Sequence, residues 1–345
     1  MRPLLLPLVG CGAAPECEFS ANPLGSLTEW EEALIAADAL PAAPDPGFLE
    51  GEEGLALAFR EWTPAGWDGT GAVAVFVPGS SAHSDQYTAI GAGLADRGVL
   101  ARIIDVRGHG LSACASADDC ADPAFTPRKI RDNSDYYRGR VGDSADANQI
   151  IRDLGHHLAD LRARWPNASL HLAGHSSGGG VVSRYLEHAG PGDLANVGLI
   201  APYNHPDQPQ VRPSVQLDCV DTVGTDYARV DVGALGDALR GNDHRYVISF
   251  HKGQAYEQPL DTLSYTWTTL QGMGTTDPDA FWTAYTVPLL FVAGSDDHLL
   301  DPEESRRQFE RAPAGGSFVV AEDTSHIGLS WSDEVAAELA AWFSG

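Results

Sequence analysis

Basic residues and long apolar runs are both scarce in this sequence. Its 22 lysine and arginine residues stand against 48 aspartate and glutamate residues, which gives a formal net charge of -26 at pH 7. Such a charge repels nucleic acids and anionic membrane surfaces, so we expect no nucleic-acid partner. No apolar run approaches the roughly 20 residues that a helix needs to cross a bilayer, so we expect no transmembrane helix.

Signatures of bound metals and nucleotides are missing as well. No histidine or cysteine spacing suggests a metal site, and there is no glycine-rich phosphate loop, so we expect no cofactor. The chain does have room for a large core. Its 345 residues, 43% of them hydrophobic, allow one large α/β domain with an insertion or two modest domains.

Apolar runs and helical patterns alternate along the body of the chain. Continuous apolar runs, typical of parallel strands buried on both faces, lie at 72–77, 99–106, 197–201, 287–293 and 317–321. Helical patterns lie at 87–97, 303–311 and 333–343. Two more flank the apolar run that begins at Leu170. Residues 48–50 and 55–62 alternate in polarity and predict an antiparallel hairpin at the sheet edge. The fold class is therefore α/β, with one mostly parallel, doubly wound sheet.

Two helix starts carry capping signals. Ser26-Leu27-Thr28-Glu29 has the Ser-x-x-Glu spacing of a capping box and predicts a helix that ends near Leu40. Asp143 or Ser144 is expected to cap a second helix, which has apolar residues on one face and ends at Trp165-Pro166.

Residues 202–286 separate two of the predicted strands and are too many for a plain loop. We interpret them as an inserted cap over the strand ends, mainly helical and unable to fold alone. The predicted organisation is a leader and tether at 1–25 and a single domain at 26–345 that contains this cap.

A candidate nucleophile follows the apolar run at Leu170. In Gly174-His175-Ser176-Ser177-Gly178, the Gly-x-Ser-x-Gly spacing predicts a sharp turn from strand to helix that exposes the hydroxyl of Ser176. The motif alone is weak in a sequence with 37 glycines. A serine hydroxyl is a poor nucleophile at its free pKa, so Ser176 needs a histidine base and a carboxylate that orients this base.

The Ser176 motif and four further motifs make residues 47–345 resemble the α/β-hydrolase superfamily. Within it they resemble the monoacylglycerol lipase and lysophospholipase-like branch of serine aminopeptidase-type hydrolases. The motifs are Val-Pro-Gly-Ser-Ser-Ala-His at 77–83, Asp-Val-Arg-Gly-His-Gly-Leu-Ser at 105–112, Gly-His-Ser-Ser-Gly-Gly-Gly at 174–180, Gly-Ser-Asp-Asp at 294–297 and Ser-His at 325–326. The resemblance implies an α/β-hydrolase fold with an inserted cap and the order Ser, acid, His for the catalytic triad.

The resemblance also assigns the remaining site residues. It implies Asp297 as the acid, with Asp296 as the alternative, and His326 as the base. It implies an oxyanion hole made by the backbone amides of Ser177 and Ser80. Pro78 stands where relatives often carry histidine, which leaves Ser81 open as the second donor.

The function implied is that of a serine hydrolase that cleaves carboxylic esters, acylglycerol-like or lysophospholipid-like, through an acyl-enzyme on Ser176. An aminopeptidase or amidase with the same triad is the alternative among enzymes, and cap carboxylates such as Glu257 and Asp261 would favour it. The alternative of another class is a non-catalytic, surface-anchored binding lipoprotein. The partner expected in the first case is a small ester or lipid; the oligomeric state stays open.

The first residues resemble a bacterial lipoprotein signal. Met1-Arg2 is followed by a leucine-rich core and by Leu-Val-Gly-Cys, which implies cleavage before Cys11 and lipidation of that residue. The apolar core is short and is broken by Pro3 and Pro7, so an unstructured start is the alternative. The resemblance implies a lipid-anchored protein of the bacterial cell envelope that contacts a membrane only through the anchor, with secretion as the alternative.

If Cys11 is lipidated, an even set of cysteines remains. Cys114 and Cys120 flank a short polar loop and are plausible disulfide partners in an oxidising compartment, which leaves Cys17 to pair with Cys219. Four cysteines allow three connectivities, and this pairing is the most economical one.

Overall fold

Apolar residues fill both faces of the central strands, and these strands form one sheet. The computed structural model describes residues 27–114, 141–212, 222–224, 227–252, 258–277, 282, 285–312 and 314–345. Within these ranges the main sheet has eight strands in the order β1-β2-β4-β3-β5-β6-β11-β12. Its strands are β1 Gly47–Glu50, β2 Ala56–Trp62, β3 Ala72–Val77, β4 Leu100–Ile104, β5 Ser169–His175, β6 Leu194–Ile200, β11 Leu289–Gly294 and β12 Gly316–Ala321.

The strand pairing is parallel from β4 to β12 and antiparallel at one edge. β1 pairs with β2 and β2 pairs with β4 in antiparallel register, so the predicted edge hairpin is confirmed. The remaining neighbours are parallel. The prediction of an α/β fold with a mostly parallel, doubly wound sheet is confirmed.

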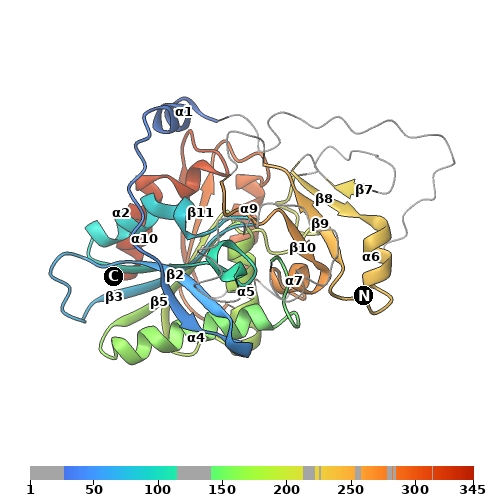
Figure 1. Ribbon diagram of the computed structural model, residues 1–345. Coiled ribbons are helices and arrows are strands. Elements are labelled where there is room, and N and C mark those ends of the chain that lie inside the picture. Colours follow the sequence, from blue (N-terminus) through green and yellow to red (C-terminus); the bar gives the residue numbers. More distant parts are fainter. Residues whose placement is uncertain are drawn as a thin grey trace.

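Helices cover both faces of this sheet, as Figure 1 shows. One face is covered by α2 Thr88–Asp96 and α10 Asp333–Ser344, and the other by α4 Gln149–Arg164, α5 Ser177–Ala189 and α9 Pro302–Phe309. Side chains alternate along β3: Val75 packs on the α4 side with Leu154, and Phe76 packs on the α2 side with Ile90. Burial on both faces explains why the strand sequences are continuously apolar.

The described part of residues 202–286 contains a second sheet, so the prediction of a mainly helical cap is wrong for these residues. Its strands pair antiparallel in the order β10-β9-β8-β7 and lie to the right of the main sheet in Figure 1. The elements are β7 Thr222–Gly224, β8 Ala228–Asp231, α6 Val232–Ala238, β9 Tyr246–Phe250, β10 Ser264–Thr266 and α7 Trp267–Gly272. Residues 246–250 are rich in aromatic and β-branched side chains, which favour a strand once neighbouring strands pair with it.

Both predicted helix starts are displaced along the chain. α1 is Glu29–Ala36 and has Thr28 as its N-cap, so the backbone of Thr28 bonds the side chain of Glu31. α4 begins at Gln149 after the N-cap Asn148. Asp143 is not the N-cap of α4. Its carboxylate instead accepts a hydrogen bond over 2.7 Å from Oγ1 of Thr266, a residue of the inserted segment 202–286.

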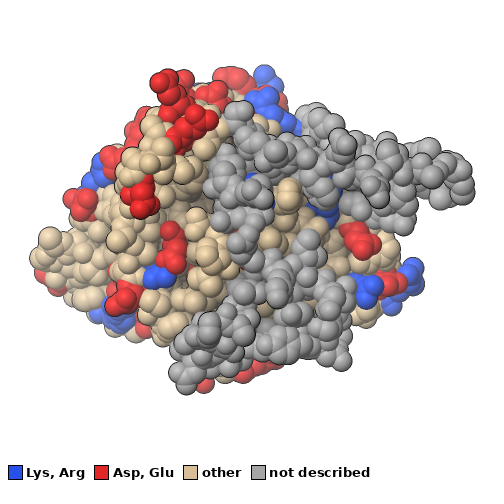
Figure 2. Space-filling model, turned by 45° about the horizontal axis from the view of Figure 1, so that its top comes forward, with Lys and Arg blue, Asp and Glu red and all other residues tan. Residues whose placement is uncertain are grey.

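The surface agrees with the composition, since acidic side chains predominate over basic ones on the face drawn in Figure 2. No helix in the described part of the chain is long and apolar enough to cross a membrane. Cys114 is disulfide-bonded. The leader at 1–25, Cys11, Cys17, Cys120, Cys219 and Glu257 lie outside the described residues, so the predictions that concern them stay predictions.

Candidate active site

Ser176 lies in the turn between β5 and α5. Its backbone has φ 54° and ψ -126°, a conformation that costs free energy for any residue with a side chain. Hydrogen bonds hold the turn on both sides, because the Ser176 amide donates to Ile200 O over 3.0 Å and its carbonyl accepts from the Tyr203 amide over 2.9 Å. A Cβ at Gly178 would lie 2.1 Å from Val77 O, so only glycine allows α5 to pack this closely on β3.

His326 and Asp297 form a buried pair beside this turn. His326 Nδ1 lies 2.7 Å from Asp297 Oδ2. The other carboxylate oxygen, Oδ1, accepts hydrogen bonds from the amides of Leu299 and Leu300 over 2.8 and 2.9 Å. Burial raises the pKa of Asp297, but the attraction of His326 and these hydrogen bonds outweigh it, so the net pKa is lowered. Asp297 is therefore a carboxylate that holds the proton of His326 on Nδ1 and leaves Nε2 free to act as a base.

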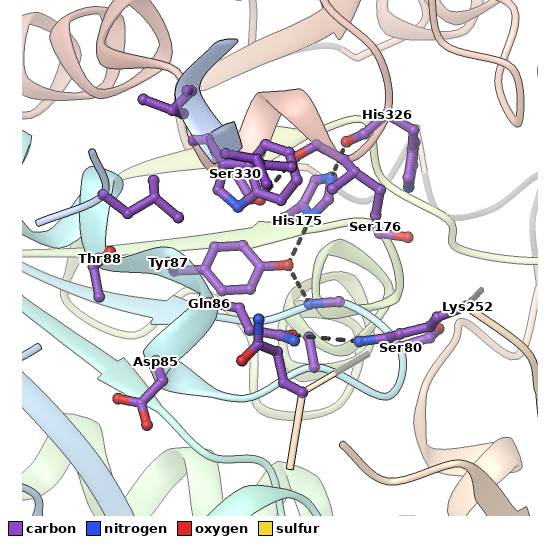
Figure 3. A pocket seen from close by; sticks show the side chains of 18 of the residues that line it. Ser80, Asp85, Gln86, Tyr87, Thr88, His175, Ser176, Lys252, His326 and Ser330 are labelled. Atoms are coloured by element: carbon purple, nitrogen blue, oxygen red, sulfur yellow. Dashed lines mark hydrogen bonds between the residues drawn. The ribbon is translucent and has the colours of Figure 1, made fainter. Parts of the chain in front are cut away.

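Ser176 and His326 both line a cavity of about 600 Å³, seen from close by in Figure 3. Nε2 of His326 is buried and has no hydrogen-bond partner in the described ranges, so the structure contains no hydrogen bond between Nε2 and Ser176 Oγ. Asp296, the alternative acid, is exposed. Asp301 caps α9 by accepting a hydrogen bond from the Glu304 amide over 3.0 Å. The structure thus brings Ser176, Asp297 and His326 together and leaves Asp296 outside.

Three tyrosine hydroxyls contact the loop that follows β3. Tyr87 accepts a hydrogen bond from the Gly79 amide over 2.8 Å, and Tyr265 accepts one from the Ser81 amide. Tyr227 donates to Ser80 O over 3.2 Å. The Ser80 amide, between the two occupied amides, makes no hydrogen bond to a described residue. These contacts favour Ser80 over Ser81 as the oxyanion donor.

The second expected donor is the amide of Ser177. Ser177 is the first residue of α5, and an amide at this position has no acceptor within its own helix. The positive end of the helix dipole also points toward Ser176 from this side. The Ser177 amide is therefore available to donate a hydrogen bond to a substrate oxyanion.

Two buried histidines orient two of these tyrosines. His175 Nε2 lies 3.0 Å from His326 O, which can only accept, so Nδ1 is unprotonated and accepts from the Tyr87 hydroxyl over 2.7 Å. By the same reasoning, His109 donates from Nδ1 to Arg107 O over 3.0 Å and accepts from Tyr265 over 2.6 Å. Burial lowers the pKa of His175 to about 3 and that of His109 to about 4, so both rings are neutral. These contacts give both histidines a role in shaping the loop.

The tyrosines were not found by sequence reasoning. Tyr265 lies 184 residues from the amide that it contacts and Tyr227 lies 147 residues from Ser80, and neither is part of a motif. Only the folded cap brings them to the loop.

One part of the cavity wall is polar and another is apolar. The polar lining includes Arg60, Asp85, Gln86, Lys252 and Gln258, and the apolar lining includes Leu34, Ile35, Leu40, Leu299, Ile327 and Trp331. Both cations have a carboxylate partner: Arg60 Nη2 bonds Asp85 over 2.8 Å, and Lys252 Nζ bonds Asp261 over 2.9 Å. These two pairs are neutral, and the exposed carboxylate of Asp38, which also lines the cavity, adds a negative charge.

The described residues contain no group of three or more His, Cys, Asp or Glu side chains that could hold a metal ion. The arrangement of a buried His–Asp pair, a serine on a strained turn and two free amides suits acyl transfer.

Comparisons with known proteins give one family match and several similar folds. The sequence profile of the family described as serine aminopeptidase, S33, matches residues 69–329. Est1E from Butyrivibrio proteoclasticus has a similar structure, with a TM-score of 0.56 and 13% identity over 86% of this chain and 98% of that one. A soluble variant of the monoglyceride lipase from Saccharomyces cerevisiae has a TM-score of 0.55 and 16% identity over 88% and 96%.

The monoacylglycerol lipase of Paleococcus ferrophilus has a TM-score of 0.54 and 18% identity over 84% of this chain and 98% of that one. At such identities the structural likeness concerns the fold alone. No curated protein matches the chain by sequence.

Proposed function

The chain belongs to the serine aminopeptidase family, S33, of the α/β hydrolases, and on that premise we propose that it is a serine hydrolase of carboxylic esters. One observation carries the proposal: the His326–Asp297 pair has its free Nε2 at the cavity that Ser176 also lines. A hydrolase of this fold needs this constellation of nucleophile, base and orienting carboxylate.

The proposed reaction uses these groups in two steps. Ser176 Oγ attacks the ester carbonyl while His326 Nε2 takes the hydroxyl proton. The amides of Ser80 and Ser177 donate to the oxyanion of the tetrahedral intermediate. His326 then gives its proton to the leaving alcohol, and water, activated by the same Nε2, hydrolyses the acyl-enzyme. Asp297 stays ionised throughout and stabilises the imidazolium.

The cavity lining supports a substrate with an alkyl chain and a neutral polar head. Leu34, Ile35 and Trp331 offer an apolar wall for the chain, and Gln86 and Gln258 offer groups that hydrogen-bond hydroxyls. A phosphate head would require positive charge in excess, but the cations of the polar wall have carboxylate partners. We therefore propose a monoacylglycerol-like ester rather than a lysophospholipid. The names of two structural neighbours, both monoacylglycerol or monoglyceride lipases, support the same choice.

The same lining leaves one carboxylate for the ammonium group of an aminopeptidase substrate, Asp38, which is exposed and forms no ion pair with a described residue. A substrate ammonium group needs a carboxylate that faces the cavity and lacks a cationic partner. Asp261 is fully buried and bonds Lys252 and the amide of Gln258, and Asp85 bonds Arg60. A non-catalytic binding protein is disfavoured because such a protein has no use for the strained Ser176 turn beside the His326–Asp297 pair.

The experiment is a turnover panel with the purified full chain. We expect the highest kcat/KM for a medium-chain monoacylglycerol, lower values for a lysophospholipid and almost none for an aminoacyl amide. Ser176→Ala and His326→Ala should each lower kcat at least about 10⁴-fold. A preference for the amide would transfer the assignment to the aminopeptidase alternative, and unchanged turnover by Ser176→Ala would refute the mechanism.

We further propose that Cys11 carries lipid and that the protein resides in the cell envelope, with Cys114–Cys120 and Cys17–Cys219 as its disulfides. The disulfide at Cys114 supports an oxidising compartment. Metabolic labelling with a fatty-acid analogue should label the natural protein. A Cys11→Ser protein that still takes the label would refute the anchor.

A further inference from the structure

The helix α1 lies outside the segment that the family profile matches, yet it contacts the loop that carries His326. Glu31 is fully buried, with 0% of its surface exposed. Its Oε1 accepts a hydrogen bond from the Ser325 amide over 2.8 Å, and its Oε2 accepts one from the Thr28 amide over 2.9 Å. The neighbouring Trp30 donates from Nε1 to Asp323 O over 2.8 Å. Two adjacent side chains of α1 thus bond the segment directly before His326.

The loop is shaped to receive the carboxyl group of Glu31. A Cβ at Gly328 would lie only 1.6 Å from Glu31 Oε1, so the absence of a side chain there makes the space that Glu31 fills. On its other side, the loop bonds the acid-bearing turn, because Thr324 O accepts a hydrogen bond from the Asp296 amide over 3.1 Å. The segment before His326 is therefore held between α1 and the turn that carries Asp297.

We propose that Glu31 is a positioning residue for the base His326 and that α1 is a working part of the active site. The proposal rests on the proposed function of Ser176 and His326. Without Glu31 the buried Ser325 amide has no partner, and the loop would move to find one. His326 is the next residue, so such a movement would shift Nε2 relative to Ser176. A misplacement of about 1 Å costs about 100-fold in rate.

The same helix also contributes to the substrate cavity. Leu34 and Ile35, one turn after Glu31, line the cavity together with Ser176 and His326. The helix α1 therefore contributes both the Glu31 contact to the loop of the base and part of the apolar lining of the cavity.

The test compares the full-length natural protein with Glu31→Ala, Glu31→Gln and the control Glu32→Ala, using p-nitrophenyl butyrate. Glu32 lies on the same helix and is exposed. We expect Glu31→Ala to lower kcat about 10- to 100-fold with KM changed by less than about 3-fold. Glu31→Gln should recover most of this loss, because its amide oxygen can still accept from Ser325. Glu32→Ala should behave like the natural protein.

The split between kcat and KM separates positioning from a general loss of structure, and thermal melting reports the folded fraction of each variant. If Glu31→Ala does not fold, Glu31→Gln and Trp30→Phe decide, and each should then lower kcat about 2- to 10-fold. Unchanged kcat in the folded Glu31 variants, or in this second pair, would overturn the proposal. If the natural protein itself does not turn over the ester or react with a fluorophosphonate, the proposed function has failed instead.

Discussion

The hydroxyl of Tyr87 lies 2.7 Å from Nδ1 of His175 and donates a hydrogen bond to it. The same hydroxyl accepts from the Gly79 amide, so it links the residue before the nucleophile to the oxyanion loop. Both partners are buried, and Tyr87→Phe would leave them unpaired. We expect this variant to lose about 1–3 kcal/mol of unfolding free energy in urea. It should also lower kcat about 10-fold, because the Ser80 amide is no longer held in place.

Tyr185→Phe is the matched control for this change. Tyr185 is half-buried on α5 and makes none of the contacts to the oxyanion loop. Its loss should leave both the urea midpoint and kcat close to those of the natural protein. Equal effects of the two substitutions on the urea midpoint and on kcat would show that the Tyr87 hydroxyl has no specific role.

Buried histidines predict a loss of stability in mild acid. Burial lowers the pKa of six of them from the usual 6.5, to about 3 for His83, His157 and His175 and to about 4 for His109, His171 and His298. Below pH 6.5 the unfolded chain therefore binds protons that the folded chain does not, so stability rises with pH in this range and falls on acidification. Each such histidine costs about 1 kcal/mol between pH 7 and 5.5.

Urea titrations between pH 7.5 and 5 measure this slope directly. His157 packs against Phe59 and does not line the cavity. His157→Phe should therefore lower the slope of the unfolding free energy against pH by the contribution of about one proton, while Ser176 and His326 stay unchanged. A stability that stays constant down to pH 5 would contradict the assignment of neutral buried histidines.

The polar wall of the cavity predicts selectivity for the substrate head. Gln86 lines the cavity, donates to Asp261 over 2.9 Å and faces Lys252, as Figure 3 shows. Gln86→Leu removes hydrogen bonds to a glyceryl head but leaves the triad untouched. We expect kcat/KM for a monoacylglycerol to fall about 5- to 10-fold, which corresponds to about one hydrogen bond. Turnover of p-nitrophenyl butyrate, which has no such head, serves as the control and should change little.

The apolar wall predicts a dependence on acyl-chain length. Ile35 lines the cavity on α1 and is 39% exposed, so a longer acyl chain could cover it. Each additional buried methylene is worth about 0.8 kcal/mol, so kcat/KM of p-nitrophenyl esters should rise with chain length in the natural protein. Ile35→Ser should make this rise shallower and spare the acetate ester. Ala36→Ser, at an exposed position of the same helix, should not alter the rise.

Local patterns predicted the parts of the fold that depend on local sequence. The run before Ser176 became β5, and the motif glycines gave the turn that exposes the serine. The resemblance to a known family assigned Asp297 and His326, which the structure brings within hydrogen-bond distance. These residues follow strands whose carboxyl ends meet at one edge of a parallel sheet, so their proximity follows from topology.

The features that sequence reasoning missed depend on contacts between distant segments. The sequence of the cap strands has no clear strand pattern. Strand preference depends on the neighbouring strands with which a segment pairs, and these are not known from the sequence. The sequence pattern predicts the capping box two residues too early, with Glu29 in place of Glu31, so it does not single out Glu31. Its contact with Ser325 spans 294 residues of sequence, and no local pattern indicates it.

The central claim is that Ser176 is the nucleophile activated by His326, and covalent labelling tests it most directly. The natural protein and Ser176→Ala are treated with a fluorophosphonate, and intact mass followed by peptide mapping locates the adduct. We expect one phosphonyl group per natural chain, bound to Ser176, and none on Ser176→Ala. Equal labelling of both proteins, or an adduct on another residue, would contradict it.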